Sequence, residues 1–243
     1  RGGSALAFTR VRMQSYSGTA PLLDCAQVWD SRFVSCLFHG GGNIDGSVGA
    51  VRLRAGIDGY GQTKESIFAN CWWESYNGPG IEISRPDDYT ATKCEMIYFA
   101  GSKMESLTCV APSIAVQGNN ILFDQHHISF KATTGPVVDL KNCKNIEGSI
   151  GYYYIQGAVV TPSCLLNADI NSWNLDLKTR VMVGSQPTGA NLITIADDQD
   201  TRNNLPITGA TSRIINGRAV SAFDNRRMLY TLSTTLPTGL GWD

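Results

Sequence analysis

The chain has 243 residues, which is long enough to bury a sizeable core in one large domain, or in a domain with a small appendix. With 42% hydrophobic residues, only 17% charged residues and 25 glycines, its composition favours a turn-rich β protein and argues against a helical bundle. The formal net charge of −1 gives no sign of an overall basic character, so no nucleic-acid partner is expected. No run of about 18 apolar residues occurs, so membrane insertion is not expected either.

Seven cysteines, an odd number, are spread over the chain without a Cys-x-x-Cys pair. We therefore expect neither a disulfide framework nor a zinc site, and we predict no metal site and no cofactor. Most of the cysteines are predicted to be buried free thiols that pack as small hydrophobic residues, which favours assembly in a reducing compartment. The chain opens with Arg1-Gly2-Gly3 rather than Met, which predicts a fragment of a larger protein.

Short runs of alternating apolar and polar residues recur between Gly, Pro, Asn and Ser, which is the pattern of β-strands. Four runs follow a Gly or Pro turn and share one form: 49–53, 79–83, 112–116 and 135–140. A second type of strand runs in phase with the first in "VSCLFHGG", "ANCWWESY", "CEMIYFAG" and "HHISFKAT". In these four segments the equivalent places are expected to be held by Phe38, Trp73, Phe99 and Phe130. The repeating unit thus holds two or three short strands and spans roughly 20 to 35 residues.

A unit of this size cannot bury its apolar side alone, whereas stacked units bury a continuous column. We therefore predict an all-β fold, a parallel β-helix, in which each unit is one coil. Interior ladders are expected, with Cys36 above Cys71 and Phe38 above Trp73, and asparagines such as Asn145 are expected near the corners of the coils. An immunoglobulin-like sandwich is the alternative, although its strands need not share one motif.

Three segments, "DSRFVSCLFHGGG", "KESIFANCWWESYNGPGIEI" and "LKNCKNIEGSIGYYYIQG", carry a resemblance that covers about residues 5–180. The chain resembles the right-handed parallel β-helix proteins of the pectate-lyase-like type, and among these the tailspike and tail-fibre proteins of bacteriophages. The resemblance implies a right-handed coil, a homotrimer, contacts with other virion tail proteins and a location in the virion tail. It also implies recognition of a bacterial surface polysaccharide. Whether the chain depolymerises that glycan as a glycoside hydrolase or lyase, or is a non-enzymatic adhesin or a structural virion shaft, stays open.

The strand pattern changes at about Gly184, where the motif of the coils stops recurring. We predict β-helix coils over 1–183 and a C-terminal β-rich cap or oligomerisation segment over 184–243. An open stack of strands requires a cap at its end. In the family that the chain resembles, such C-terminal regions often help three chains to assemble.

Carboxylates are the candidate catalytic groups, because hydrolases cleave polysaccharides with paired Asp or Glu residues. If Ile81 and Ile83 point inward, Glu82 points outward, in one column with Arg52, Ala115 and Asp139. A plain ion pair between Glu82 and Arg52 is the structural alternative to a catalytic role.

Two further acids, Asp87 and Asp88, follow along the same edge in the loop "SRPDDYTAT" and complete the catalytic candidates. Adjacent acids in a loop are also common as solvated turn residues. Lyase chemistry would instead need a basic residue that neutralises a uronate, a role open to Arg52, Arg54 or Arg85.

Aromatic residues are the candidate binding groups. Because Trp73 is expected to point inward, Trp72 must face outward, and Tyr98 is expected in the same outward position one coil later. An exposed indole and phenol form a platform on which a sugar ring can stack, or they pack against a neighbouring chain. The predicted substrate-binding residues are thus Trp72 and Tyr98, together with Arg52 and Arg85.

Overall fold

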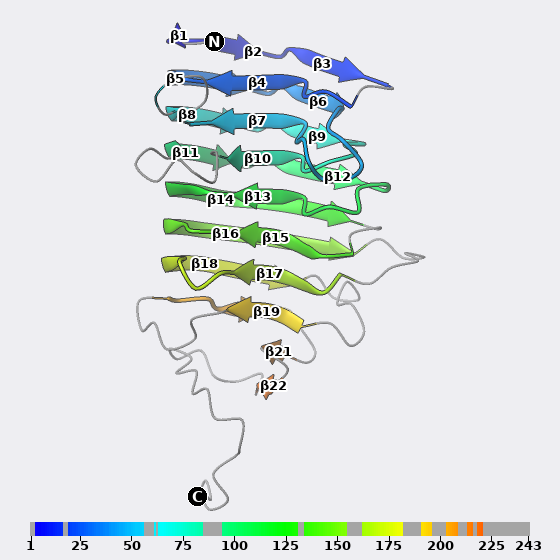
Figure 1. Cartoon of the computed structure of the whole chain (residues 1–243), viewed down its shortest axis with the longest axis vertical. Helices are drawn as coiled ribbons and strands as arrows, with labels where there is room; N and C mark the ends of the chain where they lie inside the picture. Colours follow the sequence, from blue (N-terminus) through cyan, green and yellow to red (C-terminus); the bar gives the residue numbers. More distant parts are fainter. Residues whose placement is uncertain are drawn as a thin grey trace, which may run out of the picture.

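The computed structural model describes residues 3–16, 19–55, 61, 63–84, 94–130, 134–154, 162–181, 191–195, 203–208, 213–215 and 218–220. Within these residues every regular element is a β-strand, and the strands stack in layers along one axis (Figure 1). No helix with the length and hydropathy of a membrane span occurs among them. The prediction of an all-β parallel β-helix is confirmed.

One sheet takes a single short strand from each coil. Its strands are β4 (Leu23–Ala26), β7 (Val51–Arg54), β10 (Ile81–Ser84), β13 (Ile114–Val116), β15 (Pro136–Leu140), β17 (Cys164–Ala168), β19 (Asn191–Ile195), β21 (Arg213–Ile215) and β22 (Arg218–Val220). Neighbours pair in parallel from β4 to β21, and only β21 and β22 pair antiparallel. Parallel neighbours so far apart in sequence require the chain to go once around the coil between them.

A second sheet of 13 strands wraps the rest of each coil. One rank contains β1 (Gly3–Ser4), β2 (Ala7–Thr9), β5 (Val28–Val34), β8 (Lys64–Ala69), β11 (Cys94–Ala100), β14 (Gly118–Phe130), β16 (Lys144–Tyr154) and β18 (Trp173–Val181). The other rank contains β3 (Arg12–Ser15), β6 (Leu37–Gly40), β9 (Trp72–Glu74), β12 (Lys103–Ser106) and β20 (Ile207–Thr208). The long β14 joins the two ranks, because its first half pairs with β11 and its second half with β12. Each coil therefore has three strand faces.

The corners of the coils are built from residues with positive φ at equivalent positions on successive coils. One such column contains Asp30, Glu65, Met96, Asn120, Asn145 and Asn174, with φ between 52° and 56°. Asparagine tolerates this left-handed conformation better than most residues. The Asn145 Nδ2 donates to Asn120 Oδ1 and the Asn174 Nδ2 donates to Asn145 Oδ1, both at 2.6 Å, so the side chains continue the stacking at the corner.

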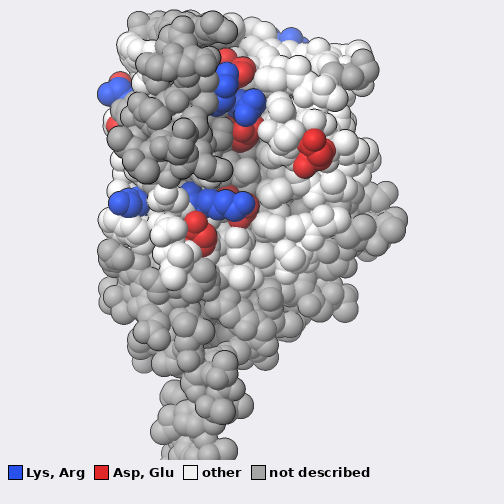
Figure 2. All heavy atoms as spheres, viewed as in Figure 1, with Lys and Arg blue, Asp and Glu red and all other residues white. Residues whose placement is uncertain are grey.

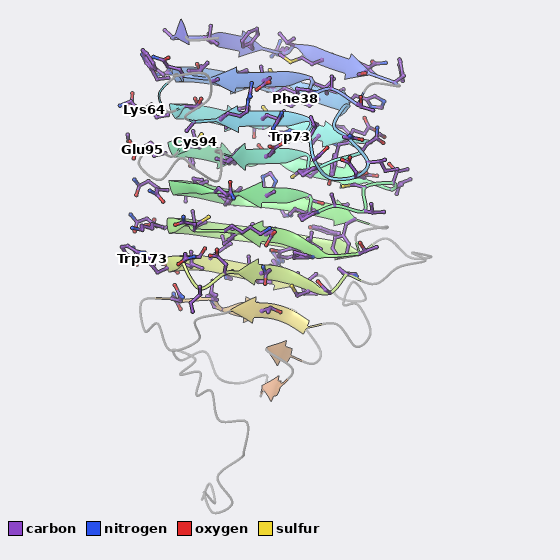
Figure 3. All side chains as sticks on the ribbon, in the orientation of Figure 1. Phe38, Lys64, Trp73, Cys94, Glu95 and Trp173 are labelled. Carbon is purple, nitrogen blue, oxygen red and sulfur yellow. The ribbon has the colours of Figure 1, made fainter. Side chains whose placement is uncertain are left out.

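The core consists of ladders in which side chains of the same or a similar type stack on one another over successive coils. Five phenylalanines stack over successive coils with ring centroids 4.5 to 5.2 Å apart: Phe8, Phe33, Phe68, Phe99 and Phe123. Phe38 and Trp73 form the neighbouring ladder, with centroids 5.1 Å apart (Figure 3).

The position of Phe99 corrects one expected register. Phe99 lies under Phe68, and the residue under Trp73 is Met104, followed by Ile128 rather than Phe130. The segment "CEMIYFAG" belongs to β11 and not to the strand type of β9. The next strand of that type, β12, carries methionine at its inward place and so lacks the aromatic signal.

All seven cysteines are buried and free, as predicted. Some of the thiols bond to the coil before them: the Cys71 Sγ donates to Phe33 O at 3.3 Å, and the Cys143 Sγ donates to Val116 O at 3.0 Å. Cys36 lies one coil from Cys71, because Leu37 and Trp72, the residues that follow them, are paired in register.

The stacking continues beyond residue 183. β19 pairs in register with β17, and β21 pairs with β19. The antiparallel strand β22 then lies at the edge of this sheet. Residues 221–243 lie outside the described part, so the division into 1–183 and 184–243 stays a prediction.

Candidate functional site

A column of outward side chains crosses the sheet of β7, β10, β13 and β15. Arg52, Glu82, Ala115 and Asp139 occupy consecutive register positions, as the alternation along these strands predicts. Figure 2 shows basic and acidic side chains beside one another on this side of the molecule. The predicted column is therefore confirmed, and its contacts decide what it can do.

The carboxylate of Glu82 has hydrogen-bond donors at both oxygens. Arg52 Nη2 donates to Oε1 at 2.9 Å, Arg52 Nε lies 2.9 Å from Oε2, and the backbone N–H of Gly49 donates to Oε2 at 2.6 Å. Glu82 as a whole is only 8% exposed. These contacts are those of an ion pair between coils, the structural alternative that the sequence leaves open, and they also occupy Arg52.

Asp139 is held in the same way two coils further along the column. Asn167 Nδ2 donates to its Oδ1 at 2.8 Å, and Lys141 Nζ lies 3.0 Å from its Oδ2. Because Ala115 between the two acids has a small side chain, a hollow of about 160 Å³ lies between them. Strand spacing puts the two acidic residues about 9 to 10 Å apart along the axis.

Three of the predicted site residues, Arg85, Asp87 and Asp88, lie outside the described residues. Their predicted roles stay predictions.

Trp72 projects from β9 with 42% of its surface exposed, whereas Trp73 is fully buried. In its row Trp72 lies between Leu37 and Lys103, and Lys103 Nζ is 4.8 Å from the centroid of the indole. Tyr98 does not share this row. It pairs with Ile67 and Leu122 on another face, because β11 belongs to the other rank.

A row of polar residues runs beside Trp72. His39, Glu74, Glu105 and Ser129 occupy consecutive register positions. His39 Nδ1 lies 3.2 Å from Glu74 Oε2, and Lys103 Nζ lies 3.1 Å from Glu105 Oε2.

The side chains of Glu74 and Glu105 are 38% and 36% exposed, so these carboxylates reach solvent while that of Glu82 is nearly covered. The alternation of side chains around Trp72 in the sequence is enough to predict that Glu74 points outward. That Glu74 lies beside Glu105 follows only from the register of β12 in the structure. We call the outward side chains of β6, β9 and β12, and of residues 126–130 of β14, 150–153 of β16 and 179–181 of β18, the tryptophan face.

The adjacent residues His126 and His127 point to opposite sides of β14, because successive side chains of a strand alternate. His126 is fully buried against the rings of Trp73, Phe99 and Phe123, and burial lowers its pKa to about 3. His127 lies on the tryptophan face. Among the described residues, no group of three or more His, Cys, Asp and Glu side chains is placed to hold a metal ion.

Comparison of the chain with protein-family models, curated proteins and solved structures finds no match.

Proposed function

We propose that this chain is the receptor-recognising β-helix of a bacteriophage tailspike or tail fibre, and that it binds a bacterial surface polysaccharide along the tryptophan face. The observation that carries the proposal is the exposed indole of Trp72, flanked by accessible charged and hydrogen-bonding groups. Sugar-binding surfaces combine an apolar ring with polar groups that fix the orientation of the hydroxyls. Successive coils repeat every 4.8 Å or so along the axis, so an extended polymer lying on this face contacts one coil after another.

The placement in a virion rests on the resemblance of three sequence segments to tailspike proteins, and the parallel β-helix fold supports the structural part of that resemblance. Under this proposal the protein is a homotrimer attached to other tail proteins and located in the virion tail.

Cleavage of the bound glycan is a second candidate function, which the register of Glu74 and Glu105 favours. These acids occupy adjoining coils, so their backbones lie about 4.8 Å apart. Retaining glycosidases hold their two carboxyl groups roughly 5 to 5.5 Å apart. Glu82 remains the candidate that the sequence proposes, although its carboxylate is engaged by Arg52 and Gly49.

Binding is tested with a panel of capsular polysaccharides and lipopolysaccharide glycans. Trp72→Ala is expected to weaken the affinity for any bound glycan roughly tenfold, because the stacking surface is lost. Tyr98→Ala, an aromatic residue on another face, is the matched control and should bind normally. Unchanged affinity in a folded Trp72→Ala protein would contradict the proposed face.

Cleavage is tested by following new reducing ends and the absorbance of unsaturated uronates. If Glu74 and Glu105 act as a catalytic pair, Glu74→Gln and Glu105→Gln each lower turnover about a hundredfold or more, while Glu82→Gln retains it. The reverse result would assign catalysis to Glu82. Binding without products would leave an adhesin, and neither binding nor products would favour a structural shaft.

A further inference from the structure

A basic row continues the tryptophan face toward the C-terminal coils. Lys103 on β12, His127 on β14, Gly151 on β16 and Arg180 on β18 occupy consecutive register positions. Lys103 and Arg180 are exposed and His127 is half-buried. Because Gly151 has no side chain, the row is interrupted between the imidazole and the guanidinium.

The imidazole of His127 leans into this interruption. A Cβ added to Gly151 would lie 2.7 Å from His127 Nδ1, and the ring of Tyr153 lies 5.5 Å from the imidazole. His127 Nδ1 is buried and has no hydrogen-bond partner among the described residues. An unpaired buried polar atom is costly, so a ligand that satisfies this nitrogen gains affinity.

The charges around the interruption are positive. Burial and the nearby cations Arg180 and Lys103 lower the pKa of His127, so the imidazole is neutral at neutral pH. The titratable groups that face it are Lys103 from β12, Arg180 from β18 and Tyr153 from β16, while Glu105 lies one row away and pairs with Lys103. Arg180 lies one coil from the Gly151 position and Lys103 lies two coils, about 10 Å, from it. An anion placed here therefore lies beside the guanidinium of Arg180 and one titratable donor, with a second cation further along the row.

We propose that Lys103, His127 and Arg180 form a binding site for the carboxylate of a uronic-acid residue, so that the glycan bound on the tryptophan face is acidic. This inference rests on the proposed glycan-binding function and names the class of its ligand. The guanidinium of Arg180 presents paired N–H donors that match a carboxylate, and Lys103 adds a second cation beside Trp72. His127 takes up a proton when the carboxylate binds and becomes a further donor.

The test compares uronate-containing capsular polysaccharides with the same polymers after reduction of their carboxyl groups to alcohols. The full chain is expected to bind the acidic polymers and to lose at least tenfold in affinity for the reduced ones. Arg180→Gln should weaken binding of the acidic polymers about tenfold. Lys178→Gln removes an exposed cation from the same strand outside the row and should leave binding unchanged.

The pH dependence tests His127 separately. Because the bound anion raises the pKa of His127, binding takes up a proton, and affinity should increase as the pH falls from about 7.5 to 5.5. His127→Gln should flatten this dependence, and Gly151→Ala should do the same by displacing the imidazole.

Two kinds of failure are distinguishable. Equal affinity for the acidic and the reduced polymers would overturn the carboxylate site while leaving glycan binding intact. Binding of sulfated polymers alone would have the same meaning. Absence of binding to every polymer would overturn both the site and the proposed function.

Discussion

At the scale of single residues, His126 has the least usual environment. It follows Ser102 in an interior row and precedes Ile150, and both of its ring nitrogens are buried without a hydrogen-bond partner among the described residues. Its neighbours are aromatic rings, so nothing in that pocket stabilises a positive charge by direct pairing. The folded protein therefore holds His126 neutral.

The stability of the protein should consequently fall in acid. Unfolding restores the pKa of His126 from about 3 to near 6.5, so the unfolded chain binds more protons than the folded one between these values. This single group should lower the free energy of unfolding by about 2 kcal/mol between pH 6.5 and 5. Urea unfolding at both pH values measures the effect, and His126→Leu should remove it. Equal pH dependence in the two proteins would show that His126 is not its source.

At the scale of elements, the corners explain how short strands turn without long loops. A single residue with positive φ bends the chain, as Asn120 and Gln125 do within the 13-residue strand β14. Asn145, an asparagine expected near a corner from its sequence context, lies at one. Glu65 and Met96 occupy the same column, and nothing in their residue type predicts it.

Replacement of Asn145 tests two contributions of a corner residue to stability: its tolerance of positive φ and the hydrogen bonds of its side-chain amide. Asn145→Ala should destabilise the protein by about 2 kcal/mol, because alanine disfavours positive φ and the amide bonds to Asn120 and Asn174 are lost. Asn145→Gly tolerates the positive φ but lacks the hydrogen bonds of the side-chain amide, so this variant should lose roughly half as much stability. Thermal unfolding of both variants gives the comparison. A neutral Asn145→Ala would mean that the corner tolerates any residue.

At the scale of the whole molecule, the core is one continuous stack and not a set of separate coils. The phenylalanine ladder alone runs from Phe8 to Phe123, and the buried cysteines extend from Cys25 to Cys164. In such a stack each coil is stabilised by its neighbours, so unfolding of one exposes the next.

The cysteines should report this cooperativity. Burial raises the pKa of Cys71, Cys94 and Cys109 to about 12 and that of Cys25 to about 11, so at pH 8 these four thiols are protonated as well as covered. All seven are expected to resist a thiol reagent in the native protein and to react together in one urea transition. Mass spectrometry of each labelled cysteine gives the order in which the cysteines become reactive as the urea concentration rises. Early labelling of Cys164 or Cys25 would show that the stack frays from an end.

The sequence by itself determined what depends on alternation along one strand and on repetition along the chain. These features include the β-helix fold, the buried thiols, the outward Trp72 and the column from Arg52 through Glu82 to Asp139. Each follows from local chemistry, because successive side chains of a strand point to opposite sides.

Only the tertiary structure decided which residues meet across coils. It placed Met104 rather than Phe99 under Trp73, brought Glu74 beside Glu105, and brought the backbone N–H of Gly49 to Glu82. The physical reason is that the register between coils depends on the lengths of all the intervening turns and on the packing of the whole interior, neither of which can be read from one strand alone.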